Sequence, residues 1–135
     1  MAPEAAEADQ RDGFSELIGL EDLGASGEEA RGRVAVTDEL RQVYGVVHGG
    51  VFATVAETIS SAATYAAVRD QGMVALGQSN ATTFLRPITD GHVNAHARVV
   101  HRGRTTWVWD VELTDDGGRL CALVRMTVAV RPRPG

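Results

Sequence analysis

Two glycines and a carboxylate in one stretch of the chain could together support acyl-transfer chemistry. Gly49 and Gly50 follow His48, and Glu57 comes seven or eight residues after them among apolar neighbours. Where glycines open a helix, free N–H groups and the positive end of the helix dipole can stabilise a carbonyl oxygen that gains negative charge. A sharp turn into a helix is the alternative interpretation. A carboxylate on an apolar helix is costly to bury unless it has partners or a function.

Three polar residues could assist the glycines and Glu57 in this chemistry. Ser61 lies four residues after Glu57 and therefore shares its helical face. A carboxylate beside a hydroxyl can orient and deprotonate water, or attack a carbonyl itself. Gln42 could donate its amide to a carbonyl, and His48 could polarise a carbonyl or simply hydrogen-bond the loop. A solvated or salt-bridged Glu57 is the competing interpretation, and its apolar neighbours argue against it.

Composition narrows the class of protein. The 135 residues suit one domain, and 44% apolar with 23% charged residues is ordinary for a soluble globular protein. No apolar run approaches the roughly 20 residues needed to cross a bilayer, and the N-terminus lacks the regions of a secretory signal. The lone Cys121 can form no intrachain disulfide. The sequence therefore predicts a cytoplasmic protein.

The charge is unevenly distributed along the chain. Residues 1–30 carry nine acids and one Arg, whereas residues 31–135 carry nine acids and twelve Arg. The arginines are scattered and the aromatics few, which favours a small anionic ligand over nucleic acid. His92, His96 and His101 do not have the spacing of metal ligands, and no nucleophile elbow, phosphate loop or dinucleotide fingerprint is present. We expect neither a metal nor a cofactor.

The first part of the chain predicts few regular elements. Residues 1–12 are charged and lack large apolar side chains, which predicts a disordered acidic leader before a single domain at residues 13–135. We expect a short helix from Phe14 to Leu20, a Gly/Ser loop at residues 24–27, and a strand around Val34 and Val36.

The sequence from Gly50 onward predicts one helix and a sheet. From Gly50 to about Arg69 apolar residues cover nearly every side, which is typical of a buried helix, and Gln71-Gly72 ends it. Four strands separated by turn signals follow, and their spacing predicts an antiparallel meander; they span residues 73–85, 92–100, 105–113 and 120–130. We expect an α+β fold in which one antiparallel sheet wraps around a central helix. The open sheet edges favour a dimer that joins two sheets.

The set Gln42, His48-Gly49-Gly50, Glu57 and Ser61 resembles hotdog-fold acyl-CoA thioesterases of the phenylacetic-acid-degradation (PaaI-like) type. It is most similar to the branch that uses Glu, which includes the 4-hydroxybenzoyl-CoA and 1,4-dihydroxy-2-naphthoyl-CoA thioesterases. The resemblance covers about residues 30–130, including Phe84-Leu85-Arg86-Pro87 and Gly118-Arg119-Leu120-Cys121. Many relatives carry Asn three residues before the strand aromatic, where this chain has Ala81, with Asn80 beside it.

The resemblance implies a role for each site residue. The Gly49 N–H would polarise the thioester carbonyl, assisted by Gln42 and His48, with Gly50 at the substrate. Glu57 would act as general base or nucleophile, and Ser61 would hold the water or orient Glu57. The site would be shared across a dimer, within a dimer of dimers, so that Glu57 of one subunit faces Gln42 and Gly49 of the other. The arginines that would meet the CoA phosphates are Arg86, Arg102 and Arg104.

The resemblance leaves the acyl group and two other functions open. Hydrolysis of an acyl-CoA with an aromatic or medium hydrophobic acyl group is the leading hypothesis. An enoyl-CoA hydratase of the same fold is an alternative, although such sites usually contain an Asp/His pair, which this helix lacks. A non-catalytic module that binds acyl-CoA or acyl-carrier protein is the other alternative, and an intact Glu57 argues against it.

Overall fold

The computed structural model describes residues 12–135, so the predicted leader lies outside the described residues except for Asp12. Asp12 is the N-cap of a short helix, α2 (Gly13–Ile18), and its Oδ1 accepts the N–H of Phe14 at 3.0 Å. Gly19 ends α2 in the left-handed conformation, at φ 76°. The predicted short helix is therefore confirmed, but Leu20 already belongs to the first strand.

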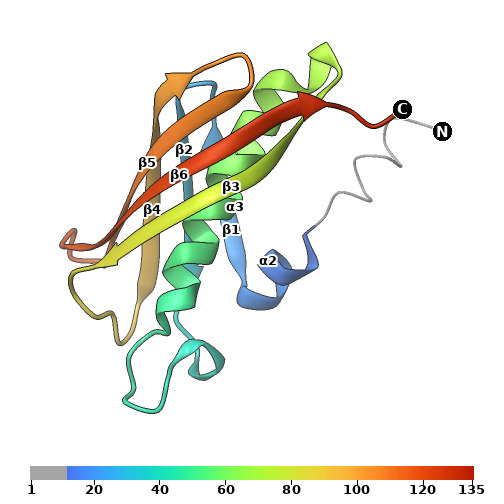
Figure 1. The fold of residues 1–135 in the computed structure, drawn as a ribbon. Coiled ribbons are helices and arrows are strands. Elements are labelled where there is room, and N and C mark those ends of the chain that lie inside the picture. The colour runs from blue at the N-terminus through green and yellow to red at the C-terminus, as the bar shows by residue number, and fades with distance from the viewer. Residues whose placement is uncertain (1–11) are drawn as a thin grey trace.

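A curved sheet of six antiparallel strands forms the body of the molecule, in the order β1-β2-β4-β5-β6-β3 (Figure 1). The strands are β1 (Leu20–Ala25), β2 (Glu29–Ala35), β3 (Met73–Phe84), β4 (His92–Arg102), β5 (Thr106–Thr114) and β6 (Leu120–Pro132). One long helix, α3 (Gly49–Val68), lies between β2 and β3 in the chain. Two short 3-10 helices flank α3, namely η1 (Asp38–Leu40) and η2 (Arg69–Gln71).

Two details of the predicted sheet are wrong. A strand, β1, precedes β2 and pairs with it, where the sequence predicts helix and loop. The strands after α3 do not form a simple meander, because β3 pairs with β6 and lies at the edge of the sheet. Residues 85–91 connect β3 to β4 by crossing the end of α3 instead of making a hairpin. Ile88 is buried there, and its carbonyl accepts the N–H of Val47 at 2.8 Å.

Helix α3 packs against the concave face of the sheet (Figure 1). Apart from Phe52, its residues turned to the sheet are small or branched; the buried ones are Val51, Phe52, Val55, Ala56, Ile59, Ser60, Ala63, Thr64 and Val68. The sheet contributes large apolar side chains from its central strands, among them the fully buried Trp109, Leu113 and Met126. Removing this apolar area from water is the main stabilising term of the fold, and it fixes α3 relative to β3.

A buried hydrogen bond also joins α3 to β5. Trp109 Nε1 donates to Thr64 Oγ1 at 2.9 Å. We expect Thr64→Val to lower the free energy of unfolding by about 1–3 kcal/mol, because the buried indole N–H loses its acceptor. Chemical denaturation measures this loss. Thr58→Val, on the side of α3 away from the sheet, is the matched control and should change stability by less than about 0.5 kcal/mol. Equal losses in both variants would contradict the prediction.

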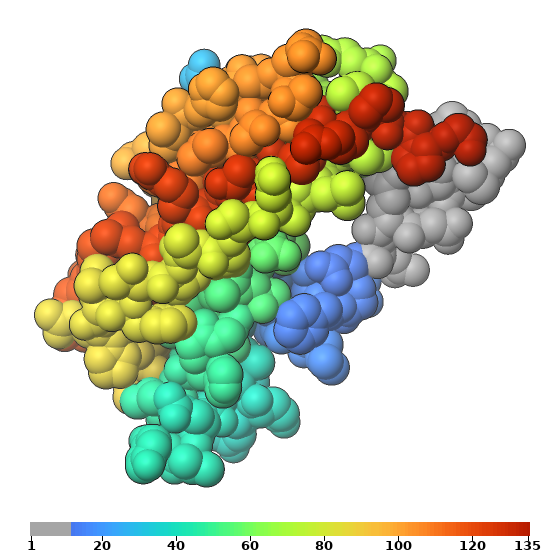
Figure 2. Space-filling view, in the orientation of Figure 1, coloured from blue at the N-terminus to red at the C-terminus, as the bar shows by residue number. Residues whose placement is uncertain are grey.

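One side of α3 and one edge of the sheet are left uncovered. Ala53, Thr54, Glu57, Thr58, Ser61 and Ala62 are exposed or half-buried, so the prediction that the helix is buried nearly all round is wrong for the single chain. Figure 2 shows α3 at the surface between β3 and α2. The free edge of β3 presents unpaired backbone groups. The helix over residues 49–71 is long and apolar enough to cross a membrane, but half of its apolar 18-residue window is buried inside the fold, as in a core helix.

Candidate active site

The N-terminus of α3 has one free backbone donor. His48 is the N-cap, and its Nδ1 accepts the N–H of Gly50 at 2.9 Å, while its carbonyl accepts the N–H of Val51 at 2.9 Å. Among residues 12–135 we find no acceptor for the Gly49 N–H. Of the two predicted glycines, Gly49 is therefore the one whose N–H is available to a ligand, and it lies at the positive end of the helix dipole. Of the two roles that the sequence allowed for His48, polarising a carbonyl or hydrogen-bonding the local backbone, the structure shows the second.

A hollow of about 460 Å³ surrounds this donor, and its lining residues are Gln42, Val46, Val47, Gly49, Phe52, Phe84, Leu85, Arg86 and Pro87. A turn holds Gln42 at the rim, because its carbonyl accepts the N–H of Gly45 at 2.9 Å and its N–H donates to Val46 O at 2.8 Å. Gly45 makes this turn possible with φ 83°. The side chain of Arg86 is exposed and forms no ion pair within residues 12–135. The hollow thus combines apolar walls with three donor groups.

Phe84 leaves little space for a side chain at position 49. A Cβ there would lie 2.8 Å from Cζ of Phe84. The Phe84 ring in turn meets Phe52 edge to face, with the ring centroids 6.0 Å apart. The ring of Phe84 therefore forms one wall beside the Gly49 N–H, and a side chain at position 49 would displace it.

Glu57 lies on the side of α3 that faces the edge strand β3. Asn80 Nδ2 donates to Glu57 Oε1 at 3.4 Å, and Gly77 lies beside the carboxylate. The side chain of Glu57 is exposed in the single chain. The expectation of a carboxylate in a buried helix is therefore wrong for the single chain, because the sheet covers only the opposite side of α3.

Ser61 presents a hydroxyl without a partner one helical turn after Glu57. Ser60 Oγ donates to Ala56 O at 2.6 Å and Thr64 Oγ1 donates to Ser60 O at 2.8 Å, whereas Ser61 Oγ is buried and has no hydrogen-bond partner among the described residues. Glu57 and Ser61 line the same hollow of about 540 Å³. A buried hydroxyl without a partner costs about 1–3 kcal/mol, so this hydroxyl is suited to bind a water or a ligand.

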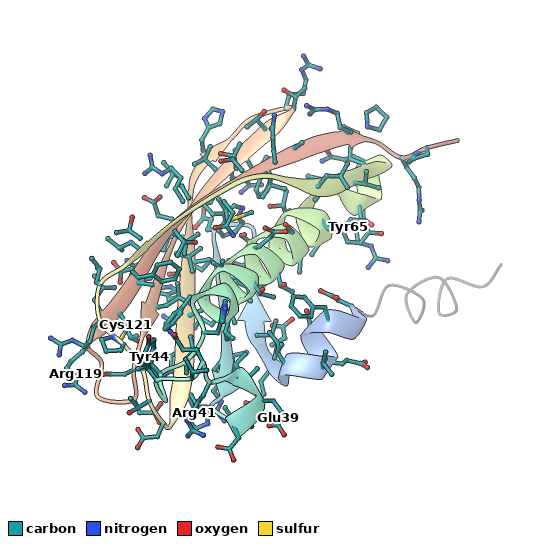
Figure 3. The ribbon with its side chains drawn as sticks, turned by 60° about the horizontal axis from the view of Figure 1, so that its bottom comes forward. Glu39, Arg41, Tyr44, Tyr65, Arg119 and Cys121 are labelled. Carbon is teal, nitrogen blue, oxygen red and sulfur yellow. The ribbon has the colours of Figure 1, made fainter. Side chains whose placement is uncertain are left out.

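The two halves of the predicted site are separate in one chain. Eight residues of α-helix separate Gly49 from Glu57, a distance of about 12 Å along the axis. The two residues also line different hollows. Figure 3 shows the two ends of α3, with Arg41 and Tyr44 of the preceding loop at one end and Tyr65 toward the other. A single carbonyl group cannot contact Gly49 and Glu57 of the same chain at once.

Arg102 and Arg104 lie elsewhere, at the tip of the β4–β5 hairpin. The Arg102 guanidinium stacks over the ring of Trp107 at 4.7 Å from its centroid. Strands β5 and β6 lie between β4, which carries Arg102, and the edge strand β3. Three steps of about 4.8 Å across the sheet therefore separate Arg102 from β3. The structure does not bring these arginines to the hollow of Gln42 and Arg86, and their predicted contact with CoA stays a prediction.

The thiol of Cys121 and the potential metal ligands form no second reactive centre within residues 12–135. Burial, with a smaller contribution from the charge of Asp115, raises the pKa of the Cys121 thiol, so the thiol stays protonated. In the described part of the chain no three His, Cys, Asp or Glu side chains are placed to hold a metal ion. The contact of Asn80 with Glu57 could not be predicted from the sequence, where the one signal for it is an Asn next to the position at which many relatives carry one.

The curved antiparallel sheet wrapped around one long helix defines the hotdog fold. The sequence profile of the thioesterase superfamily matches residues 44–122. The chain belongs to this superfamily and is a thioester hydrolase.

Relatives support this assignment over nearly the full chain. PA1618 of Pseudomonas aeruginosa is 33% identical over 98% of this chain and 91% of its own length. The crystal structure of a variant of PA1618, described as a thioesterase, matches with a TM-score of 0.86 at 31% identity, covering 98% of this chain and 95% of the other. A 1,4-dihydroxy-2-naphthoyl-CoA hydrolase of Listeria monocytogenes is 31% identical over 90% of this chain and 98% of its own. PaaI of the E. coli phenylacetic acid operon matches with a TM-score of 0.79 at 26% identity, covering 97% and 91%.

Proposed function

We propose that the protein hydrolyses an acyl-CoA thioester with an aromatic or medium hydrophobic acyl group, giving the free acid and CoA. The observation that carries this proposal is the arrangement of α3, which combines the free Gly49 N–H at its start with Glu57 and the unpartnered hydroxyl of Ser61. The similarity to a hydrolase of 1,4-dihydroxy-2-naphthoyl-CoA supports an aromatic acyl group.

In the proposed mechanism the Gly49 N–H and the Gln42 amide donate to the thioester carbonyl oxygen as it gains charge, and the dipole of α3 adds to this stabilisation. Glu57 takes a proton from a water held by Ser61, and this water attacks the carbonyl carbon. The C–S bond then breaks, and the CoA thiolate receives a proton. Alternatively, Glu57 attacks the carbonyl first, and water hydrolyses the resulting anhydride. Both routes consume one water and need neither metal nor cofactor.

The active site is proposed to form between two copies of the chain. Glu57 of one subunit would face Gln42 and Gly49 of the other, because about 12 Å of helix separates these groups within one chain. The uncovered side of α3 and the free edge of β3 support this arrangement, since an antiparallel pair of β3 strands would extend the sheet and bring the two helices together. Two such dimers would form the proposed tetramer.

Arg86 is proposed to bind a phosphate of CoA. Its guanidinium is exposed beside Gln42 and Gly49 and forms no ion pair in the described part of the chain. Arginine suits phosphate because its planar donors can bind two oxygens at once. We propose a cytoplasmic location, in keeping with a CoA substrate and a single cysteine.

A thiol-release assay tests the proposed activity. Benzoyl-, hydroxybenzoyl-, phenylacetyl-, naphthoyl- and fatty acyl-CoAs are offered to the purified protein, and free CoA is measured with a thiol reagent. We expect hydrolysis of at least one aromatic or medium-chain substrate with a kcat/KM near the usual range of about 10⁴ M⁻¹s⁻¹ or higher. An acyl-CoA that binds but is never cleaved would instead favour the non-catalytic binding module.

A further inference from the structure

An irregularity in β3 places two residues opposite Glu57. The register of β3 with β6 shifts between Gly77 and Ser79, which makes Gln78 the extra residue of a β-bulge. Residues three apart in a regular strand point to opposite faces. Because of the bulge, Gly77 pairs with Val128 and Asn80 pairs with Met126, and both of these partners are buried under α3. Gly77 and Asn80 therefore both face the helix.

The amide of Asn80 is fixed by three hydrogen bonds. Its Nδ2 donates to Ala53 O at 3.0 Å and to Glu57 Oε1 at 3.4 Å, and its Oδ1 accepts the Thr82 hydroxyl at 2.7 Å. The carbonyl of Ala53 can only accept, so the NH₂ group must be the side of the amide that faces α3. The same NH₂ group then has its second hydrogen available for the carboxylate of Glu57.

Gly77 provides the space that the other carboxylate oxygen of Glu57 occupies. A Cβ at Gly77 would lie 3.3 Å from Oε2 and 3.4 Å from Cδ of Glu57. The carboxylate therefore rests directly against the backbone of β3, in a space that a side chain would narrow. Asn80 takes one acceptor site of Oε1, and a carboxylate has about four such sites, so the others remain for a water or a substrate.

We propose that Asn80 is a positioning residue, which with the bulge at Gln78 holds the carboxylate of Glu57 in the orientation that reacts. This inference rests on the proposed function of Glu57. Glu57 is exposed and its side chain has several rotatable bonds, so without a fixed donor it would occupy many orientations. A misplacement of about 1 Å can reduce a rate about 100-fold. The side chain of Ala81 is exposed and cannot donate a hydrogen bond, so Asn80 is the residue of this pair that donates to Glu57.

A double-mutant cycle tests the inference. We expect Asn80→Ala to lower kcat by about 10- to 100-fold and to change KM by less than about threefold. In a Glu57→Gln background, which lacks the carboxylate, the same substitution should change the residual kcat by less than about twofold. Asn80→Asp has the shape of Asn but cannot donate when ionised, so it should lose at least as much kcat as Asn80→Ala.

Asn94 provides a matched control on β4. Its amide also donates to a backbone carbonyl and a carboxylate, Thr114 O at 3.3 Å and Asp116 Oδ1 at 3.0 Å. Asn94→Ala should leave kcat within about twofold of the wild type, because it lies away from α3. An unchanged kcat in Asn80→Ala, or an equal loss with and without the Glu57 carboxylate, would overturn the inference.

A readout without catalysis separates this inference from the proposed function. We expect the side-chain amide resonance of Asn80 in a ¹⁵N–¹H spectrum to shift in Glu57→Ala, which removes one of its acceptors, while the resonance of Asn94 stays in place. If no thioester were hydrolysed, the proposed function would fail, and this spectrum would still decide whether Asn80 holds Glu57. An unmoved Asn80 resonance would overturn the inference.

Discussion

Glu57→Gln is expected to remove nearly all thioester hydrolysis and to leave the fold unchanged. Glutamine keeps the shape of the side chain and can still accept a hydrogen bond from Asn80, but it is neither a base nor an effective nucleophile. General base catalysis contributes about 10²- to 10⁴-fold, so kcat should fall by at least this factor. Because the Glu57 side chain is exposed, the midpoint of thermal unfolding should stay close to the wild-type value.

Thiol release from the best acyl-CoA substrate measures this loss. Glu112→Gln is the matched control, since Glu112 is an exposed carboxylate of β5 on the outer side of the sheet, and it should retain full kcat. If Glu57→Gln keeps more than about half of the wild-type kcat, Glu57 is neither the base nor the nucleophile, and the water must be activated elsewhere.

The helix and most of the strands could be predicted from the sequence because their patterns are strong and local. Helix α3 has apolar residues at helical spacing over 20 residues, and β5 alternates cleanly through Trp107, Trp109, Val111 and Leu113. Strand β1 could not be predicted because five of its six residues are exposed, so its sequence lacks the alternation of apolar and polar residues that is typical of a strand. The pairing of β3 with β6 could not be predicted either, because the register between strands distant in the sequence depends on tertiary packing.

The candidate site was predictable only as far as spacing along one helix allows. The order of Gly49, Glu57 and Ser61 follows from the sequence, as does their place on α3. The capping bond of His48 and the bulge that turns Asn80 to the helix depend on backbone geometry, which residue types alone do not specify. The distance of about 12 Å along α3 from Gly49 to Glu57 follows from helix geometry, and it supports the shared site that the resemblance implies.

Mixing two inactive variants is expected to restore activity if the site is shared between subunits. Gln42→Ala removes a carbonyl donor and Glu57→Gln removes the base, so each variant alone should be slowed by about 10²-fold or more. A heterodimer of the two has one site in which both residues are altered and one site in which both are intact. The purified heterodimer should therefore show about half of the wild-type kcat, and a random mixture about a quarter.

A heterodimer of Glu57→Gln with Ser61→Ala is the matched control for this experiment. Glu57 and Ser61 belong to the same chain within each proposed site, so every site of this heterodimer has one altered residue, and no activity should return. Co-expression with two different affinity tags gives both heterodimers in pure form, and thiol release measures their kcat. If the Gln42→Ala and Glu57→Gln pair stays inactive while wild-type heterodimers made in the same way are active, each subunit must contain a complete site. The reacting carbonyl would then have to be reached within one chain by a rearrangement of α3 and its preceding loop, since about 12 Å of helix separates Gly49 from Glu57.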